Sequence, residues 1–224
     1  MLRIYVGDTF VELSDSDMEE SYISEGKEGI VYRYGDKALK IYKEFCNKGR
    51  LDEDETLILS EISTKRVLLP RDLIYGEDRV TFRGYATKFI EKQGIDKIID
   101  MNIMQFVDEL DIINEDLITL AKNKVYVYDF VGDNIFYDGN IYFGDPGSYT
   151  ILESMPFDFV SRNNNYNLNC AVLGYMFAGG NMEAGQFTMM FNSFEKYKYI
   201  GDQIRKNADK NESVKQYVKR IFGC

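Results

Sequence analysis

One stretch, residues 127–147, limits the folds open to this chain more than any other. Its two apolar runs, Ile135–Tyr137 and Ile141–Phe143, are joined through Asp138 and Gly139, a pair typical of tight turns. The pattern predicts a short hairpin with a polar loop on either side.

Three polar side chains lie in these flanking loops: Asp129 and Asn134 precede the hairpin, and Asp145 follows it. Because a hairpin brings its flanking loops together, we expect two carboxylates and a carboxamide to converge. Oxygen ligands of this kind suit Mg²⁺ that is held largely by substrate phosphates. The stretch therefore predicts metal–nucleotide chemistry, although an acidic turn cluster on a solvated surface would give a similar pattern.

Composition narrows the chemistry further. The 224 residues include 45% hydrophobic residues, an ordinary globular value, and the formal net charge of −10 disfavours binding to a nucleic-acid backbone. The sequence contains no histidine, which excludes Ser-His-Asp and Cys-His catalysis. Carboxylates and lysine must carry the reaction.

The three cysteines, Cys46, Cys170 and Cys224, lie far apart and form no Cys-x-x-Cys pair. They indicate neither a disulfide framework nor a zinc site. No segment approaches the roughly 18 consecutive apolar residues of a membrane helix. We expect a soluble, cytoplasmic protein with neither nucleic acid nor a membrane as its partner.

A second informative stretch, residues 21–42, alternates apolar and polar residues on both sides of a loop that contains Gly26 and Gly29. A further strand then carries Lys40. Glycines in such a loop permit close approach of the backbone to phosphates. The stretch predicts a phosphate-binding loop followed by a lysine-bearing strand.

In their order and spacing, these features resemble the protein-kinase-like family. The catalytic loop of that family is an aspartate followed five positions later by asparagine, then a strand pair, then Asp-Phe-Gly. Asp129 and Asn134 match the first part, and Asp145 begins Asp-Pro-Gly at the second. The resemblance implies that Asn134 and Asp145 bind Mg²⁺ or Mn²⁺ and that Asp129 is the catalytic base.

The resemblance extends to residues 21–42, where Gly26 and Gly29 match the second and third glycines of the family's glycine-rich loop. Ser24 stands where the first glycine would be. Four residues are then implied to contact ATP: Val31 and Ala38 on one side of the adenine, Phe136 on the other, and Lys40 at the α- and β-phosphates.

The family pairs its lysine with a glutamate on a following helix. Residues 51–65 are helix-like, and Glu55 is the expected partner of Lys40, with Glu61 as the alternative. A strand-like run at 67–70 then follows.

Two more strands are expected at 72–75 and 80–90, the second ending in a hinge between lobes. The resemblance implies that Thr87 is the gatekeeper residue. It also implies that Lys88 and Phe89 present backbone groups to adenine.

The remaining pattern is mostly helical. Residues 95–122 predict helices with Asn114 as an N-cap, residues 165–179 predict a buried helix, and Asn211 is expected to cap the last helix. Residues 14–20 are expected to be a charged connector.

Several positions depart from the family pattern. Val127 and Tyr128 replace the histidine and arginine before the catalytic aspartate, Val131 replaces a lysine that assists phosphoryl transfer, and Pro146 replaces phenylalanine. The interval 145–165 is too short for the usual peptide-docking segment. We therefore expect slow catalysis without control by phosphorylation.

We expect an α+β, bilobal protein-kinase-like fold. Residues 1–90 would form a mainly antiparallel N-lobe with one helix and the glycine-rich loop, and residues 91–224 a reduced helical C-lobe with the catalytic and metal-binding loops. The expected activity is transfer of the γ-phosphoryl group of Mg-ATP to a hydroxyl, with serine or threonine of a protein as the first choice of acceptor. The alternatives are a pseudokinase that binds nucleotides or partners, and a small-molecule kinase of the aminoglycoside or choline kinase type.

Overall fold

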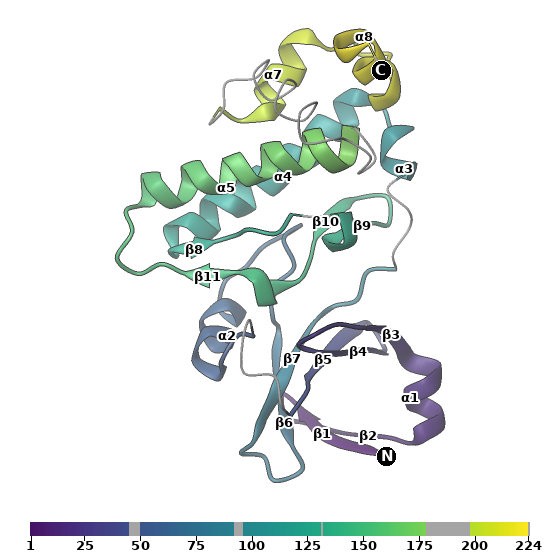
Figure 1. Cartoon of the computed structure of the whole chain (residues 1–224), viewed down its shortest axis with the longest axis vertical. Coiled ribbons are helices and arrows are strands. Elements are labelled where there is room, and N and C mark those ends of the chain that lie inside the picture. Colours follow the sequence, from purple (N-terminus) through teal and green to yellow (C-terminus); the bar gives the residue numbers. More distant parts are fainter. Residues whose placement is uncertain (45–49, 92–95, 131, 178–197, 224) are drawn as a thin grey trace. The chain divides into compact units, whose positions relative to one another are not determined.

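The computed structural model is an α+β protein whose secondary structure falls into two compact units (Figure 1). The structure describes residues 1–44, 50–91, 96–130, 132–177 and 198–223. The first unit comprises Met1–Ser63, Leu68–Ile90 and Asp145–Ser148, and the second comprises Thr64–Val67, Glu91–Gly144 and Tyr149–Cys224.

The first unit is built on one antiparallel sheet with the strand order β2-β1-β6-β7-β5-β4-β3. Its strands are β1 (Leu2–Val6), β2 (Thr9–Leu13), β3 (Tyr22–Glu25), β4 (Gly29–Tyr34), β5 (Lys37–Tyr42), β6 (Asp72–Gly76) and β7 (Phe82–Lys88). Its helices are α1 (Asp15–Ser21) and α2 (Glu53–Ser60).

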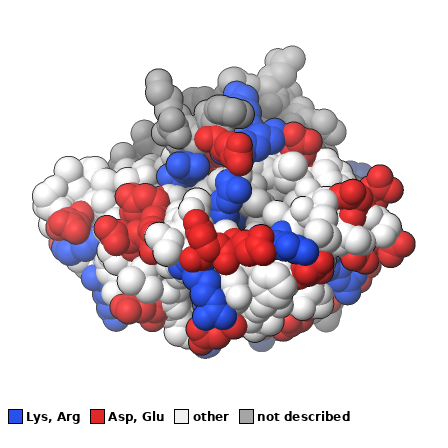
Figure 2. All heavy atoms as spheres, turned by 90° about the horizontal axis from the view of Figure 1, so that it is seen from below, with Lys and Arg blue, Asp and Glu red and all other residues white. Residues whose placement is uncertain are grey.

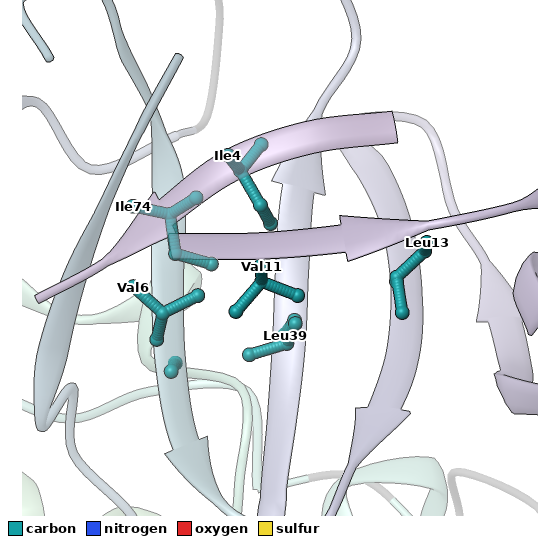
Figure 3. Packing of buried hydrophobic residues seen from close by; sticks show 7 residues of the cluster. Ile4, Val6, Val11, Leu13, Leu39 and Ile74 are labelled. Carbon is teal, nitrogen blue, oxygen red and sulfur yellow. The ribbon is translucent and has the colours of Figure 1, made fainter. Parts of the chain in front are cut away.

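The sheet is curled, so that one of its faces encloses a hydrophobic core. Leu39 on β5 belongs to the same buried cluster as Val11 on β2, although β1, β6 and β7 lie between these strands in the sheet. The buried members of the cluster are Ile4, Val6, Val11, Leu13, Leu39, Ile74 and Ala86 (Figure 3). Met18 of α1 packs against this cluster, and α1 joins the two edge strands β2 and β3.

Residues 14–20 are not the expected connector, because they begin helix α1. The Ser14 side chain accepts a hydrogen bond from the Asp17 amide, and the Asp17 side chain accepts one from the Ser14 amide. This capping box satisfies amide groups that a helix start leaves without partners. The charged residues of the segment therefore form a helix surface.

The expected strand at 67–70 is also absent from the sheet. The amides of Lys65, Arg66 and Val67 all donate to the carboxylate of Asp116, at 2.6–3.0 Å. Val67 makes only an isolated parallel bridge, with Phe143. A carboxylate thus takes the backbone donors that a sheet strand would have used.

The second unit is mainly helical. Its helices are α3 (Asp96–Ile99), α4 (Ile103–Lys122), α5 (Phe157–Ala171), α7 (Ile200–Asn207) and α8 (Val214–Phe222), with a π-helical turn at Val172–Phe177 that continues α5. Two small antiparallel pairs complete it: β9 (Ile135–Tyr137) with β10 (Ile141–Phe143), and β8 (Val125–Tyr126) with β11 (Thr150–Ile151).

Two helix caps lie elsewhere than expected. Asn114 is inside α4, which starts instead at Asn102, whose side chain accepts from the amides of Met104 and Gln105. Ser213, not Asn211, caps α8 through a capping box with Gln216. The buried helix begins at Phe157, earlier than predicted, and the expected end of that helix at residue 179 lies outside the described residues.

On the face shown in Figure 2, acidic and basic side chains are interspersed between uncharged ones. Over the described ranges, no helix is both long enough and apolar enough to cross a membrane.

The curled-sheet core provides the first test. Leu39→Ala removes a fully buried side chain, and we expect the free energy of unfolding to fall by about 2–5 kcal/mol. The matched change Leu57→Ala, at a side chain that is 49% exposed, should alter it by less than about 0.5 kcal/mol. Urea unfolding of both variants measures the difference, and equal losses would contradict this description of the core.

Candidate active site

The face of the sheet opposite the core carries a row of three side chains. Val31 on β4 pairs with Lys40 on β5, and Lys40 pairs with Tyr85 on β7. Directly paired residues point to the same side, while successive residues alternate. Leu39 therefore enters the core, and Lys40 lies on the other face between Val31 and Tyr85.

The ammonium group of Lys40 is held by two carboxylates. Its Nζ lies 2.7 Å from Oδ1 of Asp145 and 2.8 Å from Oε2 of Glu28, and the Lys40 side chain is only 15% exposed. Burial by itself would lower the pKa of Lys40, but the two carboxylates outweigh it and the pKa is raised. Lys40 therefore remains a cation in a largely buried position.

Asp145 and Gly147 are held to the same sheet. The Tyr85 hydroxyl accepts a hydrogen bond from the Gly147 amide at 3.2 Å and donates to Asp145 Oδ1 at 3.4 Å. Burial, and then the Asp145 charge, raise the pKa of Tyr85 well above its usual value, so the hydroxyl keeps its proton.

Gly147 leaves room for the charged groups around it. A Cβ atom on this residue would lie 3.0 Å from Glu28 Oε2, 3.0 Å from Lys40 Nζ and 3.1 Å from Asp145 Oδ1. The glycine of the Asp-Pro-Gly sequence thus allows the two ion pairs to form beside the backbone.

The two glycines expected to bind phosphate differ in their surroundings. A Cβ on Gly29 would lie 2.4 Å from the Ile41 carbonyl oxygen, whereas one on Gly26 would meet nothing within 4 Å. The Gly26 amide donates to the Gly29 carbonyl at 2.9 Å, which closes a tight turn. Ser24, where the resemblance has its first glycine, is exposed in β3.

The residues expected to contact adenine lie where β5 and β7 run side by side. Ala38 pairs with Thr87, and Lys37 pairs with Lys88 at the end of β7. The Phe89 amide donates to the Asp36 carbonyl at 2.8 Å, so this donor is already used within the protein. The Phe89 amide is therefore not one of the backbone groups that this segment could present to adenine.

Glu55 is not the partner of Lys40. Its carboxylate accepts from the Asp52 amide at 3.1 Å, and Asp52 accepts from the Glu55 amide at 2.8 Å, a capping box at the start of α2. Glu61, the alternative, is the C-cap of α2. An acid in the first helical turn satisfies free amides locally, and Glu28 takes the place beside Lys40.

In the second unit, Asp129 and Asn134 contact each other directly. The side-chain amide of Asn134 donates to the main-chain carbonyl of Asp129 at 3.0 Å and makes a longer contact of 3.4 Å with the Asp129 carboxylate. The main-chain carbonyl of Asn134 accepts a hydrogen bond from the Gly144 amide at 2.8 Å. A Cβ atom on Gly144 would lie 2.4 Å from the Phe136 ring, so only glycine fits beside this ring. Residue 131, where the resemblance has lysine, lies outside the described residues.

Two asparagines of α5 hold the backbone that leads to Asp129. Asn164, fully buried, accepts from the Val127 amide at 2.9 Å and donates to the Val125 carbonyl at 3.1 Å. Asn167 donates to the Val127 carbonyl at 2.7 Å. The sequence pattern predicted this helix only from residue 165 and so missed Asn164, although the run of asparagines at 163–165 was a visible signal.

Both candidate catalytic aspartates have left-handed backbone conformations. The φ angle is 64° at Asp129 and 70° at Asp145, and of the other non-glycine residues that the structure describes only Arg79 and Lys124 have a positive φ. Such conformations are uncommon and concentrate at functional sites. The backbone geometry therefore marks these two aspartates.

Asn134 in the second unit and Asp145 in the first each offer the hard oxygen ligand that Mg²⁺ prefers. Within the described part of the chain, no group of three or more Asp, Glu, Cys or His side chains is placed to hold a metal ion by itself.

No protein-family model matches the chain, and no curated protein matches its sequence.

The loop geometry gives a test that separates the two glycines. Gly29→Ala would push a methyl group into the Ile41 carbonyl, and we expect a loss of about 1–3 kcal/mol in the free energy of unfolding. Gly26→Ala should change it by less than about 0.5 kcal/mol, because the space around Gly26 is open. Thermal or urea unfolding measures both losses, and equal effects would contradict the close approach of β4 to β5 at Gly29.

Proposed function

We propose that this protein is an ATP-dependent phosphotransferase that transfers the γ-phosphoryl group of Mg-ATP to a hydroxyl group. The observation that carries the proposal is the 2.7 Å ion pair between Lys40 and Asp145, two residues 105 positions apart in the sequence. These are the lysine and the aspartate that the two sequence patterns single out independently. Their contact beside the glycine-rich loop supports a phosphate-binding role for this part of the sheet.

Lys40 is suited to phosphate because an ammonium group has three N–H donors. Asp145 and Glu28 accept two of them, and the third can reach a phosphate oxygen. The Gly26 amide is used within the turn, so the amides of Lys27 and Glu28 are the ones we propose for the remaining phosphate charge. Val31 and Ala38, on the same face of the sheet as Lys40, provide apolar surface for adenine.

Asn134 and Asp145 would hold Mg²⁺ or Mn²⁺, which neutralises charge on the phosphates during transfer. Asp129 is exposed, and its carboxylate is suited to orient the acceptor hydroxyl and take its proton. In-line phosphoryl transfer depends mostly on positioning and charge stabilisation, so this short set of residues is sufficient.

For the acceptor, we propose serine or threonine of a protein, with a small-molecule alcohol as the alternative because the interval after Asp145 is short. The reducing cytoplasm, where ATP is abundant, is the compartment we propose for the reaction.

Nucleotide binding gives the next test. A ligand that binds only the native state adds about 2.7 kcal/mol of stability at a hundredfold excess over its dissociation constant. We therefore expect ATP with Mg²⁺ to raise the melting temperature, and Asp145→Asn to remove most of the metal-dependent part of that rise. A thermal-shift titration with and without Mg²⁺ measures both, and a wild-type response no larger than that to buffer would refute the proposal.

A substitution at Asp129 separates ATP binding from phosphoryl transfer. Asp129→Asn should leave ATP affinity within a few-fold and lower phosphoryl transfer by about 10²–10⁴, the usual effect of a positioned general base. Asp133→Asn, a second exposed carboxylate four residues later, is the matched control and should leave transfer unchanged.

Both quantities are measured for the wild type and the two variants: ATP affinity by equilibrium binding, and phosphoryl transfer by single-turnover transfer of labelled phosphate. The acceptors are a generic protein mixture and a panel of small alcohols. Good ATP binding by the wild type without transfer to either class would favour a pseudokinase instead.

A further inference from the structure

We propose that Glu28, within the glycine-rich loop, is the residue that positions Lys40 for phosphate. This role deepens the proposed function and rests on it. It replaces the helix glutamate that the family resemblance implied, and it makes the loop itself part of the lysine's support.

Glu28 differs from its neighbours in the loop. Glu25, Gly26 and Lys27 are exposed, whereas Glu28 is turned inward, with its side chain 26% exposed and 2.8 Å from Lys40. The backbone at this position is anchored as well, because the Glu28 carbonyl accepts from the Lys43 amide at 2.9 Å. The carboxylate therefore extends from a fixed point toward the lysine.

A second set of contacts holds the rest of the loop. Lys43 Nζ donates to the Gly26 carbonyl at 2.9 Å and pairs with the Glu25 carboxylate. Gly147, with no Cβ, allows Glu28 Oε2 to lie close to its backbone. These contacts favour a Glu28 that the protein holds beside Lys40 over a Glu28 that only occupies the position of a phosphate group.

The geometry of the ammonium group agrees with this interpretation. Glu28 and Asp145 approach Lys40 as two separate acceptors, and neither needs to leave for the third N–H to bind phosphate. A carboxylate that only occupied the phosphate position would have to be displaced by the nucleotide. The two roles thus predict opposite effects when the charge of Glu28 is removed.

The contact can be measured without any nucleotide. In a double-mutant cycle of Glu28→Gln and Lys40→Met on the full chain, we expect the change in melting temperature caused by Glu28→Gln to shrink by at least half, or reverse, once Lys40 is methionine. Additive changes would overturn the proposal, whatever the activity of the protein.

The positioning role of Glu28 is then tested by measuring the affinity for Mg-ATP and the rate of phosphoryl transfer separately. With Glu28→Gln, we expect the dissociation constant of Mg-ATP to change less than about threefold and single-turnover transfer to slow by about 10- to 100-fold, since a misplaced group costs rate more than binding. Glu28→Asp, which keeps the charge, should recover part of the rate.

The matched control is Asp72→Asn, which removes the carboxylate 2.8 Å from Lys37, a lysine of the same strand on the opposite face. It should leave both the affinity and the rate unchanged.

Two results would overturn the positioning role: tighter ATP binding or faster transfer with Glu28→Gln, and slower transfer with Glu55→Gln while Glu28→Gln is as fast as wild type. Wild-type protein that neither binds ATP nor transfers phosphate would refute the proposed function and with it the positioning role. Because the double-mutant cycle still reports the Glu28–Lys40 contact in that case, the two failures remain distinguishable.

Discussion

The close packing of β5 between its two neighbours is the constraint on which the first unit depends. A Cβ on Gly29 of β4 would lie 2.4 Å from the Ile41 carbonyl oxygen, and one on Gly84 of β7 would lie 2.0 Å from the Lys40 carbonyl oxygen. Only glycine permits both approaches, and Gly84 in addition has a φ of 144°. With β5 fixed in this way, strand alternation sends Leu39 into the core and Lys40 to the opposite face, so the stability of the sheet and the position of the lysine have the same origin.

A buried lysine is costly unless its charge is compensated, and this requirement organises the groups around it. An unpaired ion in the interior costs several kcal/mol, and removal of one partner from a buried pair is strongly destabilising. Asp145 reaches Lys40 from a left-handed backbone conformation, and Tyr85 binds both Asp145 and the Gly147 amide. The ion pairs offset the backbone strain at Asp145, so the geometry of the Asp-Pro-Gly segment and the charge of the lysine stabilise each other.

Local sequence patterns were sufficient for much of the fold and for part of the candidate site. Alternation and turn residues predicted the strands at residues 21–42 and the β9–β10 hairpin, because those signals act over a few residues. The partner of Lys40 could not be found in that way. Glu55 has the right helix and distance along the chain, but its carboxylate is used by its own helix start. The capping residues and the Asp116 contacts that occupy residues 65–67 depend on competition among nearby acceptors, which periodicity does not reveal.

The support of the loop before Asp129 shows why an amide is well suited there. Asn164 accepts from the Val127 amide and donates to the Val125 carbonyl, and a carboxylate in its place could only accept. Its side chain is fully buried, and both ends of the amide are satisfied, so it holds the backbone without burying a charge. In a chain with a net charge of −10 and no histidine, a buried anion at this position would have needed its own cation. A neutral clamp removes that need, and it fixes the backbone before Asp129 without adding a second buried charge.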